Sequence, residues 1–196
     1  MTDEPAPKAY HHGDLRSALL VAAEAELADK GIEAFSLRQV AKRAGVSHAA
    51  PAHHFGDAGG LLTALAAEGY RAFVTMQRGH EARAASDPRS QLIAAGLGYV
   101  AFARARPALF RLMFGSSRPD FAVPDLLASA GLAYQHLVEG VSACSPGANG
   151  QDIAGVWAVA HGLADLMAAG RLQPLSDLAP DAFEAALVRI IGRALP

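Results

Sequence analysis

Several residue classes are scarce in this chain of 196 residues, and each scarcity excludes a class of protein. Cys144 is the single cysteine, so the chain can form neither an internal disulfide nor an all-cysteine metal site. No apolar run reaches the roughly 18 residues that a membrane-spanning helix needs, and the polar N-terminal segment lacks the apolar centre of a signal peptide. We therefore expect a cytoplasmic protein that does not associate with a membrane.

Charged residues are also scarce, at 18% of the chain, and the formal net charge is −2. This argues against a polycationic coat protein for nucleic acids, but specific DNA binding depends on a local basic patch and stays possible. Hydrophobic residues make up 52% of the chain, mostly as alanine and leucine, which favour helices. Because no stretch shows the sustained alternation of strands, the sequence predicts an all-α fold.

Signatures of catalysis are missing as well. The chain has no glycine-rich phosphate loop, no HExxH pair of zinc ligands, and no serine with histidine and acidic partners at a suggestive spacing. Five of the eight histidines lie near the N-terminus, without a cysteine or paired carboxylates beside them: His11, His12, His48, His53 and His54. The sequence therefore predicts no enzyme, no bound metal and no cofactor.

Carboxylates are absent between Ser36 and Gly56, in the stretch around which the rest of the chain is organised. Its sequence, SLRQVAKRAGVSHAAPAHHF, predicts two short helices joined at Gly45, since glycine adopts a left-handed conformation without strain. We expect Ser36 and Gln39 to form a capping box on the first helix and Ser47 to cap the second. Residues 36–55 thus predict a helix-turn-helix, whose second helix enters the major groove of DNA.

Within this motif, basic and polar residues are candidates for contacts with DNA. Arg38, Lys42 and Arg43 suit phosphate contact, although a solvated helix face is the alternative for each. The start of the second helix reaches base edges, and histidines there can donate to phosphate, although a structural His54 packed beside Phe55 fits the sequence about as well. The candidates are Ser36, Arg38, Lys42, Arg43, Ser47, His48, Ala49, His53 and His54.

Helical patterns continue on both sides of the motif. A helix from about Gly13 to Lys30 precedes it, after a tail over residues 1–9 that we expect to be disordered, and Asp57 caps a longer helix over about 58–78. Further helices are expected over about 91–105, 107–115, 125–143, 151–170 and 181–194. The nine predicted helices form a three-helix head, residues 13–73, and a larger helical-bundle body for ligand binding and dimerisation, residues 74–196.

Aromatic residues make up only 7% of the chain, and several of them gather in the body. For any one of them alone, a place in the core is the better interpretation. Together they can line a cavity for a small, largely apolar ligand, with His161 as the polar group that fixes its orientation. The candidate ligand-binding residues are Phe102, Phe110, Met113, Phe114, Trp157 and His161.

The last two predicted helices carry apolar stripes that favour association between copies of the chain. On the first, the stripe includes Ile153, Val156, Trp157, Ala160, Leu163, Ala164 and Met167. On the second, it includes Val188, Ile191 and Leu195. Two such helices from each subunit would form a four-helix interface with two-fold symmetry, so we expect a homodimer.

These features resemble the TetR family of bacterial transcriptional repressors. The resemblance depends on the pattern AGVSxAxxxxHF in the head and, in the body, on Trp157, His161 and Gly162, the signature of one branch of the family. It implies an all-helical homodimer that binds a double-stranded DNA operator and releases it when a small-molecule effector enters the body. We therefore expect a transcriptional regulator that acts as a repressor.

Three positions in the head depart from the family pattern. The family usually has a tyrosine where Ala52 stands and a lysine where Ala58 stands, both in contact with phosphates. Pro51 disfavours helical geometry in the residue before it and donates no backbone hydrogen bond, so the second helix of the motif starts late or is short. The alternative interpretation is a helical small-molecule-binding protein whose head has lost useful DNA affinity.

Overall fold

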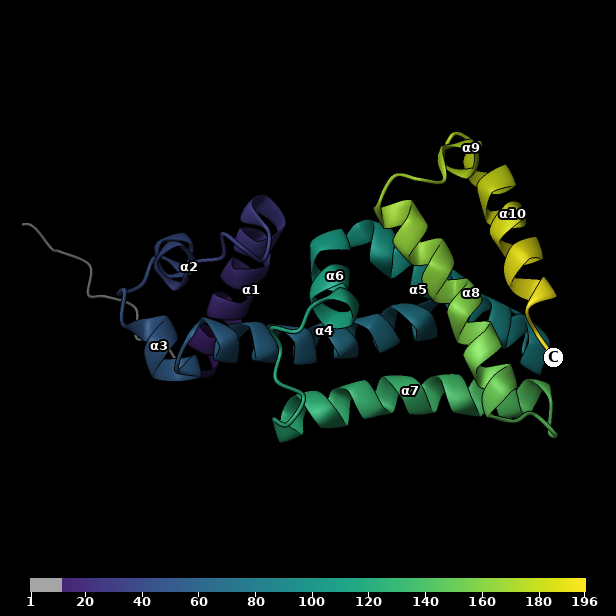
Figure 1. Ribbon diagram of the computed structural model, residues 1–196, viewed down its shortest axis with the longest axis horizontal. Coiled ribbons are helices and arrows are strands. Elements are labelled where there is room, and N and C mark those ends of the chain that lie inside the picture. Colours follow the sequence, from purple (N-terminus) through teal and green to yellow (C-terminus); the bar gives the residue numbers. More distant parts are fainter. Residues whose placement is uncertain (1–11) are drawn as a thin grey trace, which may run out of the picture.

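The computed structural model describes residues 12–196, which form ten α-helices and no strand. The first three helices are α1 (His12–Lys30), α2 (Leu37–Ala44) and α3 (Ala50–Phe55), and they form the head at one end of the molecule (Figure 1). The predicted all-α fold, with a three-helix head and a larger helical body, is confirmed. The tail predicted over residues 1–9 lies outside the described residues.

A long helix, α4, leaves the head and continues into the body (Figure 1). The helices from there on are α4 (Ala58–Glu81), α5 (Pro88–Ala105), α6 (Pro107–Gly115), α7 (Pro124–Cys144), α8 (Gly150–Ala168), α9 (Gln173–Ser176) and α10 (Pro180–Arg193). Both α5 and α7 pack along α4, while α8 and α10 pack on α5. The short α6 contacts α1, α4 and α5, so it lies between the head and the rest of the body. None of the described helices has the length and apolar character to cross a membrane.

The additional helix is α9, a single turn where the sequence predicted a connection. Leu172 and Leu175 pack it against the apolar cluster that contains Leu187 and Ile191. Four residues are too few for a helical period to be visible in the sequence, so only this tertiary packing distinguishes the turn from a loop.

The start of α4 is fixed by a cap and by a close contact with α3. The predicted cap is confirmed, since the carboxylate of Asp57 accepts a hydrogen bond of 2.8 Å from the backbone N–H of Gly60. At Gly60 a Cβ atom would lie 2.0 Å from the carbonyl oxygen of Phe55. Glycine at this position therefore allows the end of α3 to approach the first turn of α4.

One apolar core extends from the head into the body. Its buried members include Leu27 of α1, Val40 of α2 and Leu61 of α4, together with Phe102 of α5 and Phe110 of α6. The boundary predicted after residue 73 therefore divides this core, and it also lies inside the continuous helix α4. An ion pair also joins the two parts: Arg106, between α5 and α6, contacts Glu24 of α1 at 2.7 Å.

Candidate DNA-binding surface and ligand cavity

The first helix of the motif begins and ends at the predicted residues, but the predicted capping box is absent. Gly45 has the left-handed conformation expected of a C-cap, with φ of 68° and ψ of 30°. Ser36 has the extended backbone of an N-cap, but its side chain makes no capping hydrogen bond, so the predicted capping box is wrong. The first turn of α2 is at the surface, with Arg38 and Gln39 exposed, where water can satisfy the free N–H groups.

The second helix of the motif starts later than its predicted cap. Ser47 does not cap it: residues 47–49 form a turn, and α3 runs from Ala50 to Phe55 with Pro51 in its first turn. A proline is tolerated at that place because the N–H it lacks has no partner within the helix. The prediction that Pro51 makes this helix late and short is confirmed.

Most of the predicted DNA contacts lie on one exposed part of the head. Arg38 and Lys42 are exposed one turn apart on α2, and among the described residues neither has an ion-pair partner. The other exposed candidates are Ser47, His48, Ala49 and His53. His54 is half-buried, with its ring centroid 6.2 Å from that of Phe55, which is the packing that the alternative interpretation described.

Arg43 differs from the other two basic residues of the motif, because its guanidinium is occupied within the head. Its Nε lies 2.6 Å from Glu26 and its Nη2 lies 2.5 Å from Asp29, both on α1. The same guanidinium holds the pKa of Asp29 below its usual value. A phosphate would have to compete with two carboxylates, so the contacts of Arg43 support the packing of α2 on α1 rather than the predicted DNA contact.

The body contains a cavity of about 480 Å³ enclosed mainly by α4, α5, α7 and α8. Four of the six residues predicted to bind a ligand line it: Met113, Phe114, Trp157 and His161. Phe102 and Phe110 do not, and both are almost completely buried behind the cavity wall. Phe102 packs against Phe73, with ring centroids 5.4 Å apart, so its role is structural.

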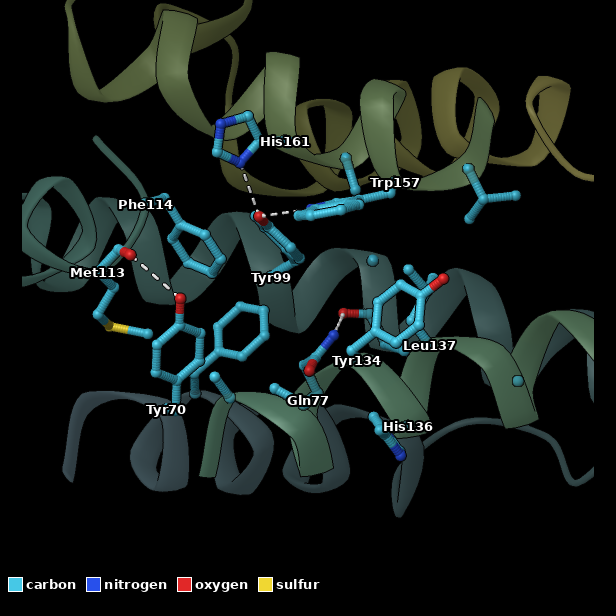
Figure 2. Close-up of a pocket in the computed structure, with 18 of the residues that line it drawn as sticks. Tyr70, Gln77, Tyr99, Met113, Phe114, Tyr134, His136, Leu137, Trp157 and His161 are labelled. Atoms are coloured by element: carbon cyan, nitrogen blue, oxygen red, sulfur yellow. Dashed lines mark hydrogen bonds between the residues drawn. The ribbon is translucent and has the colours of Figure 1, made fainter. Parts of the chain in front are cut away.

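Tyr99, which the sequence analysis did not single out, joins the predicted Trp157 and His161 (Figure 2). The Nε1–H of Trp157 donates to the hydroxyl oxygen of Tyr99 over 3.3 Å, and that oxygen lies 2.8 Å from Nδ1 of His161. An indole N–H can only donate, so the Tyr99 proton is free to point at Nδ1, which then accepts it. Burial raises the pKa of Tyr99 and keeps that proton in place.

The opposite end of the cavity is polar and was also missed. Gln77 and Glu81 of α4 line it with His136 of α7, and Figure 2 shows Gln77 and His136 on the side away from Trp157. Tyr70, on the same helix, donates a hydrogen bond of 3.1 Å to the carbonyl of Met113, and burial raises the pKa of Tyr70 to about 12. A signal was present in the sequence: Gln77 and Glu81 continue the buried stripe of α4, where apolar residues are expected.

Both parts of the chain are similar to a known family. Residues 19–65 match the family model described as bacterial regulatory proteins, tetR family. Residues 92–190 match the model described as tetracyclin repressor-like, C-terminal domain. No curated protein sequence matches the chain.

Solved structures extend the similarity over nearly the whole chain. A protein with unknown function from Rhodococcus sp. RHA1 is 34% identical, with a TM-score of 0.78 over 96% of this chain and 99% of that one. A TetR-like transcriptional regulator from the same organism is 16% identical, with a TM-score of 0.67 over 94% and 97%. A TetR family transcription regulator from Marinobacter aquaeolei VT8 is 21% identical, with a TM-score of 0.68 over 92% and 94%. At these lower identities, the two TetR structures show that the fold is shared.

Proposed function

The chain belongs to the TetR family of bacterial regulatory proteins and is a DNA-binding transcriptional regulator, and on that premise we propose that it is a repressor controlled by a small, largely apolar effector. The effector binds in the cavity of the body and lowers the affinity of the head for its operator. Such a regulator acts on DNA in the cytoplasm.

The position of α6 is the observation that carries this proposal. Met113 and Phe114, near its C-terminal end, line the cavity. Arg106, directly before its first residue, pairs with Glu24 of α1. A ligand that contacts Met113 and Phe114 more favourably in one arrangement of α6 than in another therefore also favours one arrangement of α1, which supports the motif.

For the DNA contacts, we propose that Arg38 and Lys42 bind phosphates while Ser47, His48, Ala49 and His53 face the groove. Ser36, at the start of α2, belongs to the same surface. Two observations support this proposal. Neither basic side chain has a competing ion pair among the described residues, and all six side chains other than Ser36 are exposed. Arg43 is left out of the phosphate contacts because Glu26 and Asp29 already bind it.

We further propose that the active form is a homodimer, with α8 at the interface. Two stripes motivated this prediction, and both face inward for the most part, since Val156, Ala160 and Leu163 of α8 and Ile191 of α10 are buried within the subunit. The outward face of α8 instead presents small residues, among them Ala154 and Ala158, which allow a partner helix to approach closely. Two heads held in this way would read two half-sites of one operator.

The experiment is an operator titration at several salt concentrations, with DNA from upstream of the protein's own gene. Lys42→Ala removes one phosphate contact per subunit, so we expect weaker binding and a salt slope smaller by about two units per dimer. Arg38→Ala should behave in the same way. The matched control is Arg83→Ala, an exposed arginine in the turn that follows α4, far along the chain from the motif, which should leave affinity and slope unchanged.

The opposite change tests the docking geometry. Ala58→Lys adds a positive charge at the first residue of α4, and we expect tighter binding with a salt slope larger by about two units per dimer. An unchanged slope would mean that the start of α4 does not approach phosphate. A wild-type protein that binds no DNA fragment would favour the alternative, a small-molecule-binding protein whose head has lost its DNA affinity, which the exposed Ala52 and the six-residue α3 allow.

A further inference from the structure

We propose that the effector is an apolar molecule carrying a single protonated amine, which binds at the end of the cavity formed by Gln77 and Glu81. This inference rests on the proposed function, because the same cavity has to receive the effector. Beyond the proposed function, it specifies the charge of the effector and the orientation of the effector in the cavity.

The charges around the cavity disfavour an anionic ligand. Of the described residues that line it, none is lysine or arginine, and Glu81 is the only carboxylate. The remaining side chains there that can become cationic are His136 and His161. A carboxylate or phosphate ligand would lose its hydration without gaining a permanent cation and would be repelled by Glu81.

Gln77 requires a hydrogen-bond donor from the ligand. Its side chain is 7% exposed, and its Nε2 donates to the carbonyl of Ala95 over 3.3 Å. That bond identifies Oε1 as the free end, and Oε1 is buried with no hydrogen-bond partner in the structure. An amide oxygen can only accept, and an unpartnered buried acceptor destabilises the structure, so a donor from the ligand is favoured here.

Glu81 adds a negative charge beside this acceptor. It follows Gln77 by four residues on α4, so both side chains lie on one face of the helix, at the same end of the cavity. Nε2 of His136 lies 2.9 Å from Oε1 of Glu81, but it makes no hydrogen bond. The carboxylate is therefore open to a donor from the ligand, and an ammonium supplies both that donor and a positive charge.

The remaining wall suits the apolar part of the same ligand. An ammonium has three donors, enough for both Gln77 and Glu81, whereas a hydroxyl has one. Aromatic rings bind an apolar or aromatic body and stabilise a nearby cation through their faces. The rings that line the cavity are those of Tyr70, Phe73, Tyr99, Phe114, Phe121, Tyr134 and Trp157. The ligand thus lies with its amine toward α4 and its body toward α6 and α8.

Three probes of similar size and different charge test the proposal: biphenylmethylamine, biphenylmethanol and biphenylcarboxylate. Trp157 is the only tryptophan of the chain and lines the cavity, so its fluorescence reports occupancy. We expect the amine to bind about tenfold more tightly than the alcohol, because a hydrogen bond between charged groups is stronger than one between neutral groups. The carboxylate should bind most weakly.

Substitution of the carboxylate identifies its contribution. Glu81→Gln should bring the amine down to the affinity of the alcohol and leave alcohol binding within about twofold. The control is Glu139→Gln, which removes an exposed carboxylate from α7 outside this cavity and should keep the preference for the amine. Circular dichroism and the melting temperature show whether each variant is folded, and the order of the three probes on the wild-type protein tests the proposal without any variant.

The possible failures are distinct. If the alcohol binds the wild-type protein as tightly as the amine, or if Glu81→Gln keeps the preference, the amine proposal is overturned while the cavity remains a ligand site. If no probe changes the fluorescence of Trp157 or the melting temperature, the amine proposal fails together with the effector cavity on which it depends.

Discussion

At the scale of single residues, the absence of one Cβ atom at Gly60 determines how the DNA-binding motif is attached to the body. The atom that a Cβ would meet is the backbone oxygen of Phe55, at 2.0 Å. A backbone carbonyl cannot rotate away as a side chain can, so any larger residue has to move α3 or unwind the first turn of α4. The glycine that lowers the helix propensity of that turn is therefore needed for its packing.

Gly60→Ala should lower the free energy of unfolding by about 1–3 kcal/mol, the usual cost of overpacking. It should also weaken operator binding, because α3 has to shift. Gly79→Ala is the matched control: it lies in the same helix, no atom lies within 4 Å of its added Cβ, and alanine favours the helix. Urea unfolding of both variants measures the difference, and equal stabilities would show that α3 and α4 separate without cost.

Single residues also show which features a sequence can predict. The turn at Gly45 and the cap at Asp57 depend on neighbouring residues alone, and both were predicted correctly. The capping box at Ser36 was wrong, because Ser36 stands at the N-cap position of α2 but its side chain makes no capping hydrogen bond. The cap at Ser47 was also wrong, because α3 begins at Ala50 with Pro51 in its first turn. Local chemistry is visible in the sequence, whereas the choice among competing caps depends on the surroundings.

At the scale of helices, the contact between α1 and α2 depends on a buried carboxylate. Glu26 is 1% exposed, and its Oε2 accepts from Arg43 while its Oε1 has no hydrogen-bond partner. A buried charge is tolerated only while its counter-charge is in place. The ion pair therefore fixes how α2 sits on α1, and with it the position of the surface proposed to contact DNA.

Arg43→Met should lower the melting temperature by roughly 5 °C or more, because Glu26 then stays buried without its ion-pair partner. Arg38→Met, on the exposed side of the same helix, should change it very little. The double variant Glu26→Gln with Arg43→Met should recover most of the loss, since it removes both charges together. A melting temperature of Arg43→Met equal to that of Arg38→Met would contradict a structural role for this ion pair.

The other correct and incorrect predictions depend on which way each side chain points from its helix. Hydrophobic spacing identified the inward sides of α5 and α6 but could not separate Phe114, which lines the cavity, from Phe102, which lies behind it. Both side chains point inward, and only the packing of α4 and α8 decides where space remains. Arg43 was assigned to DNA for a similar reason, since its partner Glu26 stands 17 residues earlier on another helix.

At the scale of the whole molecule, the proposed dimer predicts a mass and a way to disrupt it. Light scattering at micromolar concentration should give twice the 20.3 kDa of one chain. Ala158→Arg places a long charged side chain on the outward face of α8, so we expect a monomer that binds the operator more weakly. The same change at Ala128, exposed on α7, should leave the dimer intact. A wild-type monomer, or a dimer that tolerates Ala158→Arg, would exclude this interface.

The continuous core between head and body has a consequence for how such regulators can be recombined. A chimera that joins this head to the body of another regulator at residue 73 would cut through α4 and divide the core that Leu27, Leu61 and Ala66 share with Phe102 and Phe110 of the body. It would also separate Glu24 from Arg106. The smallest transferable module is therefore the head together with α4 and α6, and exchanging DNA specificity calls for replacing the exposed side chains of α2 and α3 rather than the domain.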